Sequence, residues 1–228
     1  MHPELTMSTG FSDIKSEDLF KKAGGPQLSL QETEINKKNR YEVRAEFMER
    51  LGKVQAYFNL DRSEAARRIY IDQFILEALE RSESQSLIIT PEENIAADRA
   101  RVGHGPLDYL ASAIDSETEN PIYWPSVVIE AKRGHQKLNH AFWQMLAQIF
   151  TLHQVTEKNE LFRGVASDGR YWTFAELHIL VDRHDNTDKE YTVFHSPRLD
   201  SANEESVMDI ISLLIRFFMY YNYRDGIL

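Results

Sequence analysis

Six short runs rich in β-branched and aromatic residues dominate the sequence between residues 86 and 195. Runs of this kind predict β-strands, here at 86–90, 106–114, 126–132, 162–167, 170–180 and 189–195. Apolar residues three to four positions apart predict helices at 39–58, 63–82, 135–154 and 205–223. The third helix falls between the third and fourth strands. This order predicts an α/β fold, in which helices pack on a mixed β-sheet.

The polar start of the chain differs from the rest. Residues 1–38 show little periodicity and contain the stretch KKAGGPQ, so we expect a flexible or loosely packed N-terminal arm. Residues 39–228 are expected to form a single domain with helices at both ends. Asp61 or Ser63 can cap the helix at 63–82, because their side-chain oxygens can accept hydrogen bonds from its first backbone N–H groups.

The amino-acid composition excludes some kinds of metal site and cross-link and bears on nucleic-acid binding. The chain has no cysteine, which excludes disulfides and thiolate metal sites. Its formal net charge is −10, whereas proteins that bind nucleic acid without sequence preference usually present a basic surface. This charge argues against strong nonspecific DNA affinity, but it leaves room for a local basic groove or a metal site built from carboxylates.

No segment predicts secretion or membrane insertion. The first residues have no apolar core of the signal-peptide type. The most apolar stretch, 207–221, is too short to span a bilayer and carries Asp209 and Arg216, so it predicts a buried helix. We therefore expect an intracellular protein, cytoplasmic or nuclear, without membrane contact.

Three charged residues interrupt two of the expected strands. Asp108 lies in GPLDYLASA, and Glu130 and Lys132 lie two apart in VVIEAKRG, so the latter two point to the same face of their strand. The 22 residues from Asp108 to Glu130 suit a connection between neighbouring strands. Two carboxylates and a backbone carbonyl, that of Ala131, suit Mg²⁺ or Mn²⁺. A lysine beside such an ion can orient water for phosphodiester hydrolysis.

The alternative for these residues is an internal salt-bridge cluster or a solvated strand face. Other catalytic patterns are missing from the sequence: it has no HExxH, Walker A, GxGxxG or GxSxG motif. The ordered set of GxxD, an apolar strand with ExK and a following helix with glutamine favours the metal site.

This ordered set resembles the PD-(D/E)xK nuclease superfamily, whose fold is restriction-endonuclease-like. The resemblance covers about residues 61–195 and is carried by GPLD, IEAK and the helix after them, in which Gln144 lies 12 residues after Lys132 and Gln148 one turn later. RGVASDGRYWTFAEL resembles the strand–turn–strand that follows in many members. Leu107 departs from the strict pattern before the aspartate. Within the superfamily, GHGPLDY with IEAKRG looks most like the nuclease-like domains of crinkler-type effector proteins.

The resemblance implies a fold order α-β-β-β-α-β and a set of roles. Members often carry a glutamate on the first helix that reaches the metal, and Glu77 is the first choice here, with Glu64 as the alternative. Lys132 would position the attacking water, and Gln144 would orient Lys132 or a phosphate. If the chain is effector-like, it would act inside a host cell.

We therefore expect a Mg²⁺-dependent nuclease that hydrolyses DNA, with RNA as the less favoured substrate. The alternative is a catalytically inactive module of the same fold that binds a protein or nucleic-acid partner, which the net charge supports. The aromatic run Phe217, Phe218, Tyr220, Tyr221 and Tyr223 exceeds one helix face. Part of it suits a homodimer interface, and burial against the N-terminal helices is the favoured alternative.

Overall fold

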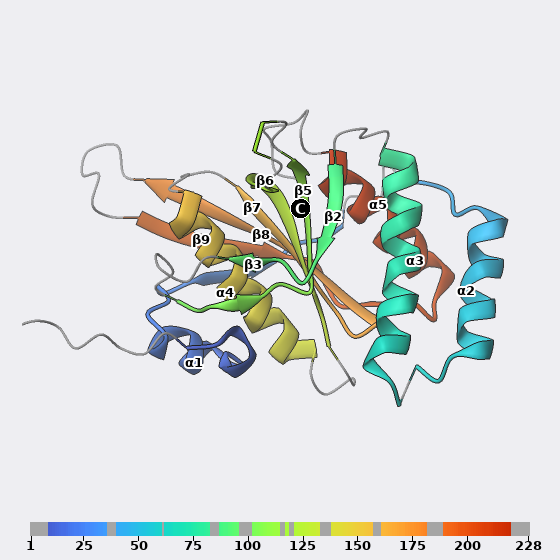
Figure 1. Ribbon diagram of the computed structural model, residues 1–228, viewed down its shortest axis with the longest axis horizontal. Helices are drawn as coiled ribbons and strands as arrows, with labels where there is room; N and C mark the ends of the chain where they lie inside the picture. The colour runs from blue at the N-terminus through green and yellow to red at the C-terminus, as the bar shows by residue number, and fades with distance from the viewer. Residues whose placement is uncertain are drawn as a thin grey trace, which may run out of the picture.

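A large mixed β-sheet with helices on both faces organises the computed structural model (Figure 1). The structure describes residues 9–35, 40–60, 62–82, 87–95, 102–114, 117–118, 121–132, 138–156, 161–181 and 189–219. The α/β class expected from the order of strands and helices is confirmed.

The sheet has the strand order β1-β9-β8-β7-β6-β5-β2, with β10 paired to β8. Neighbouring strands are antiparallel except β6 with β7 and β1 with β9, which are parallel. The strands are β1 (Ser29–Glu32), β2 (Leu87–Pro91), β5 (Tyr109–Ile114), β6 (Pro121–Ala131), β7 (Phe162–Ser167), β8 (Tyr171–Val181), β9 (Lys189–His195) and β10 (Leu199–Asp200). A separate hairpin pairs β3 (Asn94–Ile95) with β4 (Gly105–Pro106). All six strands predicted from the sequence are confirmed.

Helices cover the two faces of this sheet unequally (Figure 1). The crossover helix α4 (Leu138–Thr156) packs on β6 and β7, with the short helices η1 (Phe11–Asp13) and α1 (Glu17–Lys22) beside it. The helices α2 (Ala45–Tyr57), α3 (Glu64–Ser82) and α5 (Glu204–Phe218) lie on the other side. Two apolar clusters follow from this layering, one on each face.

Local signals explain where the helices begin. Ser63 Oγ accepts a hydrogen bond from Ala66 N at 3.2 Å, as expected for a cap of α3, whereas Asp61 lies outside the described residues. Asn203 Oδ1 accepts from Glu205 N at 2.8 Å and caps α5. The turn between β7 and β8 needs Gly169, whose φ of 87° lies in the left-handed region.

The N-terminal segment is packed, in place of the loose arm that we expected for residues 1–38. Phe11, Ile14 and Phe20 are buried in the cluster on the α4 face. Strand β1 extends the sheet by pairing in parallel with β9. The sequence did not predict this packing because the segment is mostly polar. The four residues of β1 are all exposed, and only isolated apolar side chains anchor the segment. Residues 1–8 and 36–39 lie outside the described residues.

The C-terminal helix α5 is buried, as expected. Phe217 and Phe218 are each 1 % exposed and pack in the core, while Tyr220, Tyr221 and Tyr223 lie outside the described residues. Of the described helices, none is both long and apolar enough to cross a membrane.

Candidate active site

Asp108 and Glu130 meet at one end of the sheet. Strands β5 and β6 pair antiparallel with Tyr109 opposite Ile129, so Asp108, which directly precedes β5, comes opposite Glu130. Asp108 Oδ2 accepts a hydrogen bond from Ala131 N at 2.8 Å, which fixes the carboxylate beside the end of β6. The expectation that these two residues come from neighbouring strands is confirmed.

Lys132, the residue directly after β6, joins this pair. Its ammonium forms an ion pair with Glu130 Oε1, and its backbone N donates to Ser167 O at 2.8 Å, which holds the end of β6 against β7. The Glu130 side chain is 4 % exposed and that of Lys132 25 %. Lys132 is therefore the more exposed member of the ion pair.

A glutamine of α4 completes the contacts of Glu130, but it is Gln148 and not Gln144. Gln148 Nε2 donates to Glu130 Oε2 at 2.6 Å, whereas Gln144 Nε2 donates to Phe11 O at 2.9 Å. The expected role of Gln144 in orienting Lys132 is therefore not supported by its contacts. Helix α4 approaches closely because Gly164 of β7 faces it: a Cβ there would lie 2.6 Å from Met145.

Burial, and then the negative charge of Asp108, raise the pKa of the Glu130 carboxyl to about 7, against the opposing effects of Lys132 and of the hydrogen bond from Gln148. Near neutral pH the protonated and the ionised form of the Glu130 carboxyl are therefore both populated. A divalent cation at the site would favour the ionised form.

This raised pKa predicts how stability depends on pH without divalent ions. The folded protein holds a proton on Glu130 between pH 4.5 and about 7 that the unfolded chain has released, so the free energy of unfolding falls as pH rises through that window. We expect Glu130→Gln to remove the fall and to be more stable than the wild type above about pH 7, by about 1–3 kcal/mol. Urea unfolding in EDTA across this window measures it, with exposed Glu46→Gln as the control. Parallel pH profiles for Glu130→Gln and the wild type would contradict it.

Arg68 makes a contact that no sequence pattern predicts. Its guanidinium donates to Asp108 Oδ1 at 2.5 Å and to Glu92 Oε1 at 3.2 Å. Asp108 is thus held by Arg68 on one oxygen and by the Ala131 N–H on the other. The two carboxylates of the site are balanced by the two cations Arg68 and Lys132.

Glu77 lies elsewhere, so its predicted role at the metal is wrong for this structure. It is 1 % exposed and pairs with Arg44, Arg50 and Arg81. Along α3 it lies nine residues beyond Arg68, which is a rise of about 13 Å. The α3 carboxylate that contacts the start of β5 is Asp72, which accepts from Tyr109 Oη at 2.9 Å. The side chain of Glu64, the other choice, lies outside the described residues.

The oxygen ligands available at this site fit a hard cation such as Mg²⁺. The described side chains alone do not supply all the ligands that such an ion needs. No group of three or more histidine or carboxylate side chains that could hold a metal occurs among the described residues. Asp108, Glu130 and the Ala131 carbonyl supply only oxygen, which suits Mg²⁺ or Mn²⁺. Residues 133–137, with their basic side chains, lie outside the part that the structure describes.

No protein-family model matches the chain, and no curated protein matches it either. The chemistry of this site therefore rests on its own residues.

Proposed function

We propose that the chain is a metal-dependent nuclease that hydrolyses DNA phosphodiester bonds. The observation that carries this proposal is the meeting of Asp108 and Glu130 across neighbouring strands, with the partly exposed Lys132 ion-paired to the buried Glu130. Two carboxylates placed side by side repel each other, and their pairing at the end of a sheet suits a shared cation.

The chain order around the site supports a restriction-endonuclease-like fold. Helix α3 precedes β2, β5 and β6, which are neighbours in the sheet, and α4 then crosses to β7, which is parallel to β6. Apart from the small β3–β4 hairpin, this is the α-β-β-β-α-β order that the resemblance to the PD-(D/E)xK superfamily implies. Membership of that superfamily, and the closer likeness to crinkler-type effectors, are part of the proposal.

Each residue then has a role in the proposed reaction. Asp108, Glu130 and the Ala131 carbonyl would hold Mg²⁺ or Mn²⁺, and the ion would stabilise charge on a phosphate and lower the pKa of water. Lys132, the more exposed partner in its ion pair with Glu130, would position the attacking water with its ammonium. Gln148 holds the second oxygen of Glu130, so that the carboxylate keeps its orientation.

The second candidate function is a catalytically inactive module of the same fold that binds a partner. It is favoured by the cationic partners that both carboxylates already have, Arg68 for Asp108 and Lys132 for Glu130. A salt-bridge cluster of this kind needs no metal to be stable. The net charge of −10 also suits a basic protein partner better than DNA.

Incubation with supercoiled plasmid and Mg²⁺ or Mn²⁺, with and without EDTA, tests the two functions. Nicking that EDTA abolishes supports the nuclease. An intact plasmid, together with an unfolding temperature that Mn²⁺ leaves unchanged, supports the inactive module. A rise in unfolding temperature without nicking would show a metal site that lacks this activity.

Arg68 competes with a cation for Asp108, which gives a prediction for metal affinity. A divalent ion needs the carboxylate that the guanidinium holds at 2.5 Å. We expect Arg68→Gln to tighten Mn²⁺ binding by about tenfold, which corresponds to about 1.4 kcal/mol. Isothermal titration calorimetry measures the affinity, with the exposed Arg62→Gln as the control. Weaker binding in Arg68→Gln would show that Arg68 supports the site instead.

The expected homodimer and the intracellular location stay predictions. Phe217 and Phe218 are buried in the core, and Tyr220, Tyr221 and Tyr223 lie outside the described residues. Size-exclusion chromatography with light scattering tests the dimer.

A further inference from the structure

Arg198 is an exposed arginine near the end of the sheet at which the proposed catalytic residues lie. Its guanidinium carbon lies 4.5 Å from the centre of the Tyr171 ring. Among the described residues, this guanidinium has neither a hydrogen-bond nor an ion-pair partner. Stacking uses the flat face of a guanidinium and leaves its N–H groups, which lie in the plane, free to donate. Arg198 can therefore bind an anion without losing a contact that it makes in the structure.

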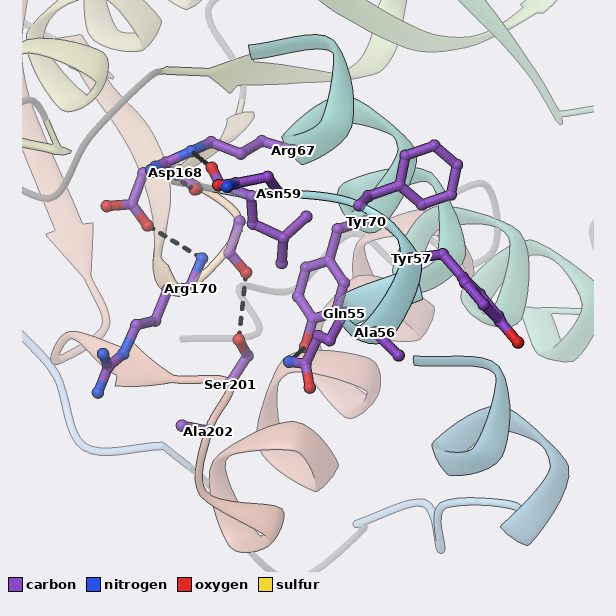
Figure 2. A pocket seen from close by; sticks show the side chains of 13 residues that line it. Gln55, Ala56, Tyr57, Asn59, Arg67, Tyr70, Asp168, Arg170, Ser201 and Ala202 are labelled. Atoms are coloured by element: carbon purple, nitrogen blue, oxygen red, sulfur yellow. Dashed lines mark hydrogen bonds between the residues drawn. The ribbon is translucent and has the colours of Figure 1, made fainter. Parts of the chain in front are cut away.

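Two other arginines at this end of the sheet are already engaged. Arg170, at the turn between β7 and β8 in Figure 2, makes two contacts of 3.1 Å with the carboxylate of Asp200. Arg67, also shown there, donates to Leu60 O and to Asp168 O. An anion would have to compete with these partners, so neither arginine suits the binding of a phosphate.

The ends of β7 and β8 separate Arg198 from Lys132. Lys132 N donates to Ser167 O at the end of β7, and Tyr171, the first residue of β8, carries the Arg198 guanidinium. Neighbouring strands lie about 4.8 Å apart, so the two strand spacings from β6 to β8 correspond to about 10 Å. One strand of DNA carries a phosphate for every ~3.4 Å of helix axis, so this separation matches about three nucleotides.

Arg198 and Lys132 also lie on the same face of the sheet, the one that α4 covers. Glu130, the partner of Lys132, accepts a hydrogen bond from Gln148 of α4. Tyr171, on which Arg198 stacks, packs against the apolar cluster of this face. A phosphate chain can therefore contact both cations without crossing the sheet.

Arg198 lines a pocket of about 420 Å³ between the first turns of α4 and the ends of β8, β9 and β1. Its lining includes Thr173 of β8 and Asn139 of α4, whose side chains have no hydrogen-bond partner among the described residues. Arginine, threonine and asparagine side chains are common donors to phosphate and sugar oxygens in nucleic-acid complexes. The pocket thus adds neutral donors beside the cation.

The acidic residue of this pocket, Glu32, lies on the side away from the catalytic residues. Glu32 is opposite His195 in the pairing of β1 with β9. The Arg198 guanidinium instead lies over Tyr171 of β8, and β9 lies between β1 and β8 in the sheet. The cation is therefore on the side of the pocket that faces Lys132, and the carboxylate is on the far side.

We infer that Arg198 binds a backbone phosphate of the DNA about three nucleotides from the cleaved bond, so that the substrate runs from Lys132 across the ends of β7 and β8. The planar guanidinium can offer two parallel N–H groups to phosphate oxygens. A contact to phosphate adds affinity without sequence preference, and a local contact of this kind is compatible with the net charge of −10. The inference rests on the proposed function and specifies the path of its substrate.

Fluorescence anisotropy of fluorescein-labelled DNA duplexes in EDTA tests this contact without metal-dependent cleavage. A series of KCl concentrations gives the slope of log affinity against log salt, to which each neutralised phosphate contributes about 0.9. We expect Arg198→Gln to weaken binding about fivefold, equally for two duplexes of unrelated sequence, and to reduce the slope by about one. Arg198→Lys keeps the charge and is expected to keep the slope. Exposed Lys189→Gln, at the other end of β9, is the matched control and is expected to change neither quantity.

Wild-type affinity and slope in Arg198→Gln, an equal loss in Lys189→Gln, or a wild type that does not bind the duplexes would each overturn the inference. A slope in Arg198→Lys as low as that of Arg198→Gln would overturn it too, because the charge would then not be what matters. Circular dichroism of each variant separates loss of binding from loss of fold.

The plasmid assay separates this inference from the proposed function. A wild type that nicks plasmid, with Arg198→Gln binding DNA as the wild type does, would end only this inference. A wild type whose DNA binding depends on Arg198 but which nicks no DNA would end the nuclease proposal and leave Arg198 as a phosphate-binding residue.

Discussion

Lys132→Ala is expected to reduce metal-dependent plasmid nicking by at least about 100-fold, within the range that positioned acid–base groups contribute. Lys132 is more exposed than its partner Glu130, and the substitution removes the ammonium that is proposed to position the water. The variant also leaves the buried Glu130 without its ammonium partner, but this carboxyl can take up a proton, so the variant is expected to be less stable than the wild type while keeping its fold. Initial nicking rates with Mg²⁺ and Mn²⁺ measure the effect, alongside the unfolding temperature.

Lys189→Ala is the matched control for this variant. Lys189 is an exposed lysine that pairs with Val181 at the opposite end of β8 from the site, so its loss should leave nicking unchanged. Undiminished nicking by Lys132→Ala would end the proposed mechanism. An equal loss in both variants would point to nonspecific electrostatic effects instead.

Arg163→Met is expected to lower the free energy of unfolding by about 3–5 kcal/mol, because it leaves a buried carboxylate without its cation. Arg163 and Glu176 face each other on β7 and β8, 1 % and 0 % exposed, with Arg163 Nε 2.8 Å from Glu176 Oε1. The guanidinium also lies over the Phe217 ring of α5. Urea denaturation measures the loss.

The double variant Arg163→Met with Glu176→Met separates charge from packing. Replacing both members of a buried ion pair with apolar side chains of similar size is often neutral or stabilising. We therefore expect the double variant to recover most of the loss. A double variant as unstable as Arg163→Met would show that the packing against Phe217 matters more than the charge.

The strands could be predicted because their apolar runs are long and bounded by turn residues. The same pattern predicted that Asp108 and Glu130 come from neighbouring strands, because a connection of this length suits adjacent strands, and the structure adds that they lie opposite each other. The SDG turn followed equally from its glycine, which takes the positive φ that other residues avoid.

Contacts made by long side chains could not be predicted in this way. Gln144 and Gln148 lie one turn apart on α4, and which of them reaches Glu130 depends on how η1 docks against the helix. Arg68 is one of several charged residues on α3, and nothing in its neighbourhood marks it as the partner of Asp108. Glu77 resembled a ligand by its spacing, but the three arginines around it come from α2, α3 and the segment before α2.

The parallel pairing of β1 with β9 has a practical consequence for anyone who shortens this protein. Deleting the polar first thirty-five residues would remove β1 from the sheet. The backbone N–H and C=O groups of β9 that pair with β1 would then be free to pair with a strand of another chain. It would also uncover the surface of α4 that Phe11 and Phe20 shield. Such a truncated protein is expected to self-associate or precipitate, so affinity tags and fusion partners belong before residue 9, with residues 9–35 left intact.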